Sequence, residues 1–266
     1  MNDPFGRTID YLRVSVTDRC NLRCWYCAPT QNWRLLDHEE LLSFDEITSV
    51  VRAAAALGFR KIRITGGEPL LRAGLPDLVQ RIAATPGIAD LGLTTNGILL
   101  AAMARPLREA GLRRVNVSLD AVDPARFAAV TGGGDLAPVL AGIEAALDAD
   151  LRPVKLNCVV KRDPGEPDAR AVAAWAAAHG CEARFIPQMD MERGLFSKVF
   201  GGTGGDCPAC NRLRLSSAGL LLPCLFSEPA FSVRELGAGE ALRRAIDAKP
   251  EVGGRCSRNW MHGIGG

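Results

Sequence analysis

Residues 11–27 read YLRVSVTDRCNLRCWYC, a stretch in which a short alternating segment runs directly into three cysteines. In Leu12–Thr17 the apolar residues alternate with polar ones, a pattern typical of a β-strand with one polar face. Cys20, Cys24 and Cys27 follow as Cys-x3-Cys-x2-Cys on the loop after this predicted strand. Three thiolates on one tight loop can ligate three irons of a [4Fe–4S] cluster and leave the fourth iron open.

Structural zinc is the alternative for this first cysteine group. A structural zinc site needs four closed ligands, and the next Cys or His along the chain is His38. The loop position, the spacing and the aromatic Tyr26 beside the last cysteine favour the cluster.

Outward from this stretch, short β-branched runs alternate with Ala- and Leu-rich segments of helical periodicity. The predicted strands are Leu12–Thr17, Lys61–Thr65, Asp90–Thr94, Arg114–Leu119, Val154–Val160 and Glu182–Pro187. The predicted helices are Phe44–Leu57, Pro76–Ala84, Leu99–Ala110, Pro124–Val130, Pro138–Ala149 and Pro167–His179. Repeated strand–helix units predict an α/β fold with a parallel sheet, either doubly wound or curled into an incomplete barrel.

The repeating pattern stops after about residue 190, and the Gly-rich stretch 201–205 leads into a segment with its own cysteines. This change predicts two domains, residues 1–195 and 196–266.

The predicted strands alternate, whereas parallel strands are usually apolar throughout. If the apolar faces meet the helices, the polar faces line an interior. That interior would hold the cations Arg13, Lys61, Arg63, Arg114, Lys155 and Arg184 against essentially one acid, Asp120. Any one of these cations could instead reach solvent at a strand end. As a set they favour a polyanionic substrate, because buried charges without counter-ions are costly.

Composition sets the broad class. The 266 residues are 47% hydrophobic and 23% charged, as in an ordinary globular protein. A net charge of +2 gives no support for a nucleic-acid or membrane partner, and no apolar run is long enough to cross a bilayer. We therefore expect a cytoplasmic protein, in which grouped cysteines bind metal rather than form disulfides. Of the nine cysteines, Cys158, Cys181 and Cys256 stand alone and are expected to be packing thiols.

Two further motifs carry possible site residues. One follows the second predicted strand, and the other follows the Gly-rich stretch 201–205. Thr65-Gly66-Gly67-Glu68-Pro69 can bring backbone close to a ligand and offer a carboxylate to an ammonium group, although alone it could be only a turn. Cys207-x2-Cys210-x13-Cys224 is a second group of three thiols. By spacing alone it could be a zinc knuckle completed by Cys256 or His262, or a second cluster.

These segments together resemble the radical S-adenosylmethionine (SAM) superfamily and, within it, the GTP 3′,8-cyclase family of molybdenum cofactor biosynthesis. The segments that carry the resemblance are YLRVSVTDRCNLRCWYC, KIRITGGEPLLR, LTTNG, VNVSLD, KLNCVVKR, the Arg184-Phe185-Ile186 segment, CPACNRLRLSSAGLLLPCLF and the terminal Gly-Ile-Gly-Gly. The resemblance implies an incomplete (β/α)6 TIM-like barrel with a small cysteine-bearing C-terminal extension. It implies a lyase that converts GTP to 3′,8-cyclo-7,8-dihydro-GTP by means of a 5′-deoxyadenosyl radical.

The resemblance also assigns residues to two [4Fe–4S] clusters, SAM and GTP. Cys20, Cys24 and Cys27 would bind the first cluster, and Cys207, Cys210 and Cys224 the second, whose open iron binds guanine. The SAM contacts would be Tyr26, Gly67, Glu68, Ser118 and Met189. The GTP contacts would be Arg13, Lys61, Arg63, Thr94, Lys155, Arg184, Arg212, Leu213 and Arg214. Arg13 and the terminal Gly265 and Gly266 would serve catalysis.

Implied partners are GTP, an electron donor such as flavodoxin or ferredoxin, and a downstream cyclic pyranopterin monophosphate synthase; a homodimer is possible within this family. The chain departs from the family pattern at Pro187, where family members usually have Glu. It also has only about twenty residues between the Phe185–Met189 segment and Cys207, where members have a longer connection. A two-cluster maturase acting on a peptide or other small molecule, and a non-catalytic zinc protein that binds nucleotide, are the competing interpretations.

Overall fold

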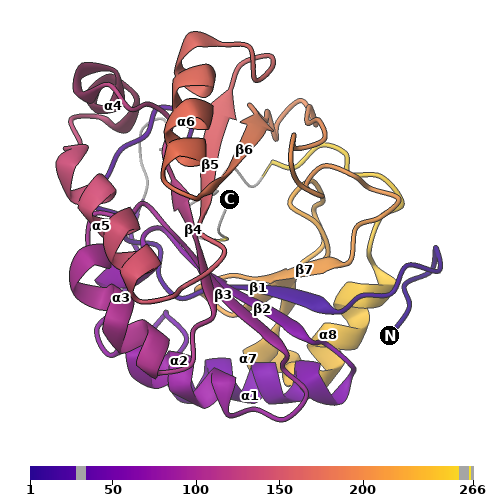
Figure 1. Cartoon of the computed structure of the whole chain (residues 1–266). Helices are drawn as coiled ribbons and strands as arrows, with labels where there is room; N and C mark the ends of the chain where they lie inside the picture. The colour runs from indigo at the N-terminus through magenta and orange to yellow at the C-terminus, as the bar shows by residue number, and fades with distance from the viewer. Residues whose placement is uncertain (28–33, 258–263, 265–266) are drawn as a thin grey trace.

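One curved sheet organises the molecule (Figure 1). The computed structural model describes residues 1–27, 34–257 and 264, and within them nine strands are hydrogen-bonded in the order β6-β5-β4-β3-β2-β1-β7-β8-β9. Strands β1 to β6 are all parallel to their neighbours. The described edge strands β6 and β9 do not pair with each other, so the barrel is incomplete, as predicted.

The strand–helix units lie where the sequence predicts them, with ends that differ by one or two residues. The strands are β1 (Tyr11–Ser15), β2 (Lys61–Thr65), β3 (Asp90–Thr95), β4 (Arg114–Ser118), β5 (Lys155–Val160) and β6 (Glu182–Pro187). The helices are α1 (Phe44–Ala56), α2 (Leu75–Ala83), α3 (Leu100–Glu109), α4 (Pro124–Thr131), α5 (Ala137–Asp148) and α6 (Pro167–Ala178), with a short 3-10 turn, η1 (Pro69–Leu71). These helices lie outside the curved sheet (Figure 1).

Local signals explain where helices begin. The Ser43 hydroxyl accepts the Glu46 backbone N–H, and the Glu46 carboxylate accepts the Ser43 N–H, which is a capping box at the start of α1. The Asp123 side chain caps α4 in the same way by accepting the Arg126 N–H.

The C-terminal part continues the same sheet. Strand β7 (Arg212–Leu215) runs parallel to β1 on the side opposite β2, and β8 (Leu220–Leu222) and β9 (Phe231–Ser232) follow antiparallel. Helix α8 (Ala238–Asp247), preceded by the short α7 (Val233–Leu236), packs against α1. Leu213 and Leu242 belong to the same apolar core as the barrel strands. The sheet and the apolar core are continuous across residue 195. The division into two domains at this residue stays a prediction.

The chain between β6 and β7 runs beside the open side of the sheet (Figure 1). Phe185 of β6 and Phe200 exchange two backbone hydrogen bonds, of 3.1 and 2.9 Å, which tie this connection to the sheet. None of the described helices is long and apolar enough to cross a membrane.

Candidate active site

The first cysteine group lies on the loop that leaves β1. Its thiols are close enough to act on one another: the pKa of Cys24 is raised to about 12 by burial, then by the charges of Asp120 and Cys27. Burial and Cys20 raise the pKa of Cys27 to about 11. A metal ligand must be a thiolate, so the bound metal rather than the surrounding protein has to stabilise that form.

The arrangement of the thiols in the first cysteine group distinguishes a zinc site from an iron–sulfur cluster. Within residues 1–27, 34–257 and 264, no three His, Cys, Asp or Glu side chains are close enough to hold one metal ion. In a [4Fe–4S] cluster each thiolate binds a different iron, so the sulfurs stay farther apart than the ligands of a single ion. Three neighbouring, partly buried thiols on one loop therefore fit a cluster.

Gly66 and Gly67 pack directly on the cluster loop. A Cβ at Gly66 would lie 2.7 Å from the Thr17 carbonyl oxygen, and one at Gly67 would lie 2.3 Å from that of Arg19. The Gly67 N–H donates to the Thr17 oxygen at 2.8 Å. Glycine is required because any side chain would separate the two loops.

Glu68 is 1% exposed, and nearby backbone and side-chain donors surround its carboxylate. Oε1 accepts the Thr95 hydroxyl at 2.7 Å and the Leu70 N–H, and Oε2 accepts the Asn96 N–H at 2.6 Å. Burial raises its pKa to about 7, although these hydrogen bonds favour the charged form. The carboxylate therefore holds the Thr95–Asn96 turn in place, and its expected contact with the SAM ammonium group stays a prediction.

The raised pKa of Glu68 predicts a pH-dependent stability. Its pKa is about 7 in the folded chain against 4.5 for a free side chain, so the folded state binds more protons between these values. The contribution of protonated Glu68 to the free energy of unfolding is therefore complete below pH 4.5 and is lost as the pH rises through 7. We expect the advantage in unfolding free energy of the wild type over Glu68→Gln to shrink by about 2–3 kcal/mol from pH 5 to pH 8. Urea unfolding of both proteins at several pH values measures this; a constant difference would contradict it.

A cavity opens at the carboxyl ends of the strands, beside the cysteine loop. It is lined by the first cysteine group and by four of the five predicted SAM contacts, Tyr26, Gly67, Ser118 and Met189, together with Thr94. Glu68 lies behind this lining. The Tyr26 hydroxyl donates to Asp120 Oδ2 at 2.6 Å, which fixes the ring at the cavity wall. Burial raises the pKa of Asp120.

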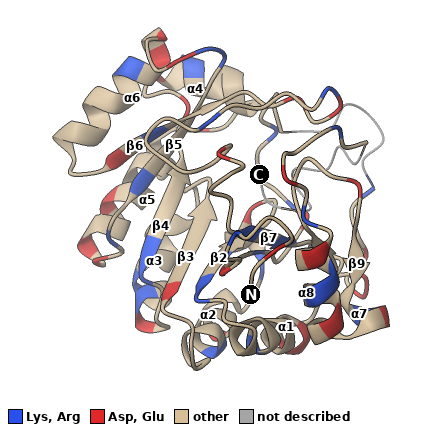
Figure 2. Cartoon of the chain, turned by 90° about the vertical axis from the view of Figure 1, so that its right-hand side faces the viewer, with Lys and Arg blue, Asp and Glu red and all other residues tan. Residues whose placement is uncertain are grey.

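Strand register places three arginines in one row. Arg13 of β1 lies opposite Arg63 on β2 and opposite Arg214 on β7. Burial, then the charges of Arg13 and Arg212, lower the pKa of Arg214 to about 9. Lys and Arg colour several of the neighbouring strand ribbons (Figure 2). The parallel pairing of β7 with β1 creates this row.

The Arg63 side chain extends across β3 at Gly92, which has no side chain in its way. Its guanidinium Nη1 donates to the Leu93 carbonyl and, at 2.8 Å, to Asn116 Oδ1. A Cβ at Gly92 would lie 3.0 Å from Arg63 Cζ. The guanidinium is thus held in the interior, at 4% exposure of the residue.

Sequence reasoning missed Tyr11. Two residues before Arg13 on the same face of β1, it lies opposite Lys61 on β2 and Arg212 on β7. Burial alone would raise its pKa, but the charges of Arg13, Arg63 and Arg212 lower it to about 8. The alternation that placed Arg13 in the interior also applies to Tyr11 and could have found it.

The expectation of one acid among these cations is wrong. Arg114 forms an ion pair with Asp90, with Nε–Oδ1 at 2.8 Å, and Lys155 forms one with Glu182, also at 2.8 Å. Both acids stand at the first position of neighbouring strands, where sequence alone does not give the pairing. Asp120 instead bonds Tyr26 and the Val159 N–H.

Two predicted contacts need separate comment. The Leu213 side chain is fully buried in the core on the opposite face of β7, so only its backbone could meet a nucleotide. Gly265 and Gly266 lie outside the described residues. Just before them, the Ile264 carbonyl accepts the Arg214 guanidinium at 3.5 Å, which brings the start of this tail to the arginine row.

The second cysteine group surrounds the start of β7. The Cys210 N–H donates to the Cys207 carbonyl, and the Cys224 and Cys210 thiols lie close enough to interact. Burial opposes ionisation of Cys210, but the charges of Lys249 and Arg212 outweigh it and lower its pKa. Cys256 donates to the Ser227 carbonyl at 3.3 Å, and His262 lies outside the described residues. Cys210 and Cys224 are thus neighbouring thiols, the donor type that holds iron–sulfur clusters, and a second cluster at this group stays a prediction.

The partial barrel and the cysteine loop after β1 define a class. The radical SAM superfamily model matches residues 14–176. Solved structures with the same fold include native anSMEcpe with bound AdoMet and Kp18Cys peptide, with a TM-score of 0.62 and 16% identity over 91% of this chain and 81% of that chain. Another is methylornithine synthase, with a TM-score of 0.55 and 14% identity over 69% and 54% of the two chains.

Curated relatives that match nearly the whole chain identify a family within this superfamily. The GTP 3′,8-cyclase of Pelotomaculum thermopropionicum is 39% identical over 100% of both chains, and that of Geobacter sulfurreducens is 38% identical over 94% of this chain and 92% of its own. The chain belongs to the radical SAM superfamily and, within it, to the GTP 3′,8-cyclase family. The Pelotomaculum alignment spans 330 positions against 266 residues here, a difference of 64.

Proposed function

We propose that this protein is a GTP 3′,8-cyclase that uses two [4Fe–4S] clusters and SAM and catalyses the first step of molybdenum cofactor biosynthesis. One observation carries the choice of substrate: buried polar atoms on three predicted GTP contacts have no hydrogen-bond partner within the described residues. These atoms are Thr94 Oγ1, Arg63 Nε and Arg184 Nε. Buried polar groups normally form hydrogen bonds, so these groups suit a ligand that is rich in hydrogen-bond acceptors.

The arginine row explains how a triphosphate would be recognised. Guanidinium groups bind phosphate oxygens in a fixed two-point geometry, and the low-dielectric interior strengthens each contact. Arg63 and Arg184 form no ion pair with a described carboxylate, so their charges are available to the substrate. Arg13, between Arg63 and Arg214, would contact the phosphates at the centre of the row.

The cavity beside the first cysteine loop suits SAM. Cys20, Cys24 and Cys27 would hold the first cluster, which would supply the electron for reductive cleavage of SAM. The chain's own residues bind and orient: Gly67 and Ser118 line the wall, and Glu68 fixes the adjacent turn. A substrate held next to this cavity, with water excluded by the buried strands, is positioned for hydrogen abstraction.

The test is anaerobic reconstitution followed by addition of dithionite, SAM and GTP. The proposal expects about eight irons per chain and formation of 3′,8-cyclo-7,8-dihydro-GTP. Eight irons and 5′-deoxyadenosine without the cyclised product would point to the maturase alternative. Zinc in the second site would point to the nucleotide-binding alternative.

Arg212 provides a narrower prediction for this function. Its backbone pairs with β1, and its guanidinium Nη2 donates to the Thr203 carbonyl at 2.8 Å beside the second cysteine group. We expect Arg212→Ala to weaken GTP binding about 10- to 100-fold, through loss of a charge-assisted hydrogen bond, while SAM cleavage continues uncoupled. Equilibrium dialysis with labelled GTP and a 5′-deoxyadenosine assay measure the two effects. Unchanged GTP affinity would remove Arg212 from the site.

The remaining partners belong to this proposal. A small flavodoxin or ferredoxin would deliver the electron, and cyclic pyranopterin monophosphate synthase would take the product onward. The protein would act in the cytoplasm, as a monomer or a homodimer.

A further inference from the structure

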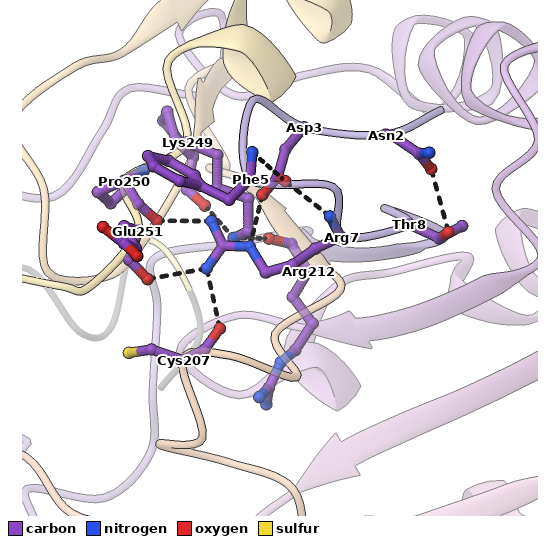
Figure 3. A network of polar contacts seen from close by, with 11 residues as sticks. Asn2, Asp3, Phe5, Arg7, Thr8, Cys207, Arg212, Lys249, Pro250 and Glu251 are labelled. Carbon is purple, nitrogen blue, oxygen red and sulfur yellow. Dashed lines mark hydrogen bonds and ion pairs between the residues drawn. The ribbon is translucent and has the colours of Figure 1, made fainter.

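A buried ammonium group lies against the peptide segments that carry Cys210 and Cys224. Figure 3 shows this residue, Lys249, in one polar network with Arg212, Arg7 and Cys207. Lys249, just after α8, is 3% exposed. Its Nζ donates to the Arg212 carbonyl at 2.7 Å and to the Pro223 carbonyl at 2.9 Å. Arg212 comes two residues after Cys210, and Pro223 comes directly before Cys224. The ammonium group thus joins the two peptide segments that carry these thiols.

A second cation nearby, the half-buried Arg7, has its own counter-ion. Arg7 donates from Nε to the buried Asp3 carboxylate at 2.6 Å. Its other nitrogens donate to the carbonyls of Cys207, Pro250 and Glu251 (Figure 3). Asp3 therefore neutralises the Arg7 charge, and the remaining Arg7 nitrogens hold the backbone of the neighbouring segments.

Lys249 forms no ion pair with any carboxylate in the described part of the chain. Two neutral carbonyls satisfy hydrogen bonds but do not cancel a charge, and an uncompensated buried cation is strongly unfavourable. An anion must therefore lie within reach of its Nζ. The candidates are the thiols of Cys210 and Cys224, because the two carbonyls that bind Lys249 Nζ belong to Arg212, two residues after Cys210, and to Pro223, directly before Cys224.

We propose that Lys249 is the counter-ion of the second cluster. Three thiolates give a [4Fe–4S]²⁺ cluster a net negative charge, and one-electron reduction adds to it. The ammonium group offsets this charge, raises the cluster's reduction potential and holds Cys210 and Cys224 at their ligand positions. It also lowers the repulsion that a negative cluster would exert on a polyanionic substrate. Lys249 is a positioning residue, and this role rests on the proposed second cluster but not on the identity of its substrate.

The test isolates the second cluster in the full-length chain by replacing Cys20, Cys24 and Cys27 with alanine. Three versions are compared: Lys249, Lys249→Gln and Lys249→Arg. Glutamine keeps a hydrogen-bond donor for the carbonyls without the charge, and arginine keeps the charge. Arg244→Gln is the matched control, because Arg244 is exposed on α8 and pairs with Glu240, so solvent screens it. Iron content, the rate of iron loss to a chelator and an EPR-monitored redox titration are measured.

We expect Lys249→Gln to shift the midpoint potential to more negative values and to speed iron loss several-fold. Lys249→Arg and the Arg244 control should stay near the parent. A Lys249→Gln potential equal to that of the control, at equal iron content, would overturn the proposal and leave Lys249 as a backbone clamp. A second site that takes up no cluster would overturn it too. If the shift appears but the wild-type protein does not cyclise GTP, the inference stands and the proposed function fails.

Discussion

Replacing Cys24 with serine is expected to abolish 5′-deoxyadenosine formation and to lower the iron content from about eight to about four per chain. Burial and the nearby Asp120 raise the pKa of Cys24 to about 12, so the site offers no help to a free anion. A serine oxygen is harder than sulfur and ionises less readily than a thiol, so it cannot replace the thiolate on iron. The two remaining thiols cannot retain the cluster.

Cys181→Ser is the matched control. Cys181 is half-buried after α6, and within the described residues its thiol donates to the His179 carbonyl. It should keep both the iron and the SAM cleavage. Retention of about eight irons in Cys24→Ser, or equal losses in both variants, would contradict the assignment of the first cluster to this loop.

The strands and helices of the barrel follow from local patterns. Ser43 and Asp123 mark helix starts through their own side-chain hydrogen bonds, and apolar alternation fixes the buried face of each strand. Such signals act over a few residues, which is why Lys61–Thr65 and Glu182–Pro187 are predicted with their observed bounds.

Pairing between distant strands does not follow from local patterns. The Arg13 and Arg214 pair joins residues two hundred positions apart, and only the fold brings β7 beside β1. The ion pairs of Arg114 with Asp90 and of Lys155 with Glu182 depend on register in the same way. The sequence therefore predicts which residues are cationic and interior, but not which of them are already neutralised.

The glycines after β2 illustrate a second limit. The sequence indicates that Gly66 and Gly67 allow a close approach, and the structure identifies the approaching group as the backbone of the cysteine loop. The Glu68 carboxylate, expected to meet an ammonium group, is bound by three donors from its own surroundings. Local composition predicts close packing or a polar contact without specifying the partner.

Arg13→Met should have opposite effects on binding and on stability. Arg13 is half-buried between Arg63 and Arg214, and desolvation together with the charges of Arg63 and Arg212 lowers its pKa. Removing it from a crowded cationic row relieves repulsion, so the ligand-free protein should gain about 1 kcal/mol in unfolding free energy. The same change should weaken GTP binding by about two orders of magnitude, because a buried guanidinium–phosphate contact is lost.

Arg114→Met is the comparison variant, because Arg114 forms an ion pair with Asp90. Its removal leaves Asp90 without its partner, so the ligand-free protein should lose about 1 kcal/mol, while GTP affinity should change less than about tenfold. Urea unfolding and equilibrium dialysis of the two variants give both quantities. A loss of stability in Arg13→Met equal to that in Arg114→Met would mean that Arg13 is a structural cation. Opposite signs would support a role for the Arg13 charge in binding a polyanionic ligand.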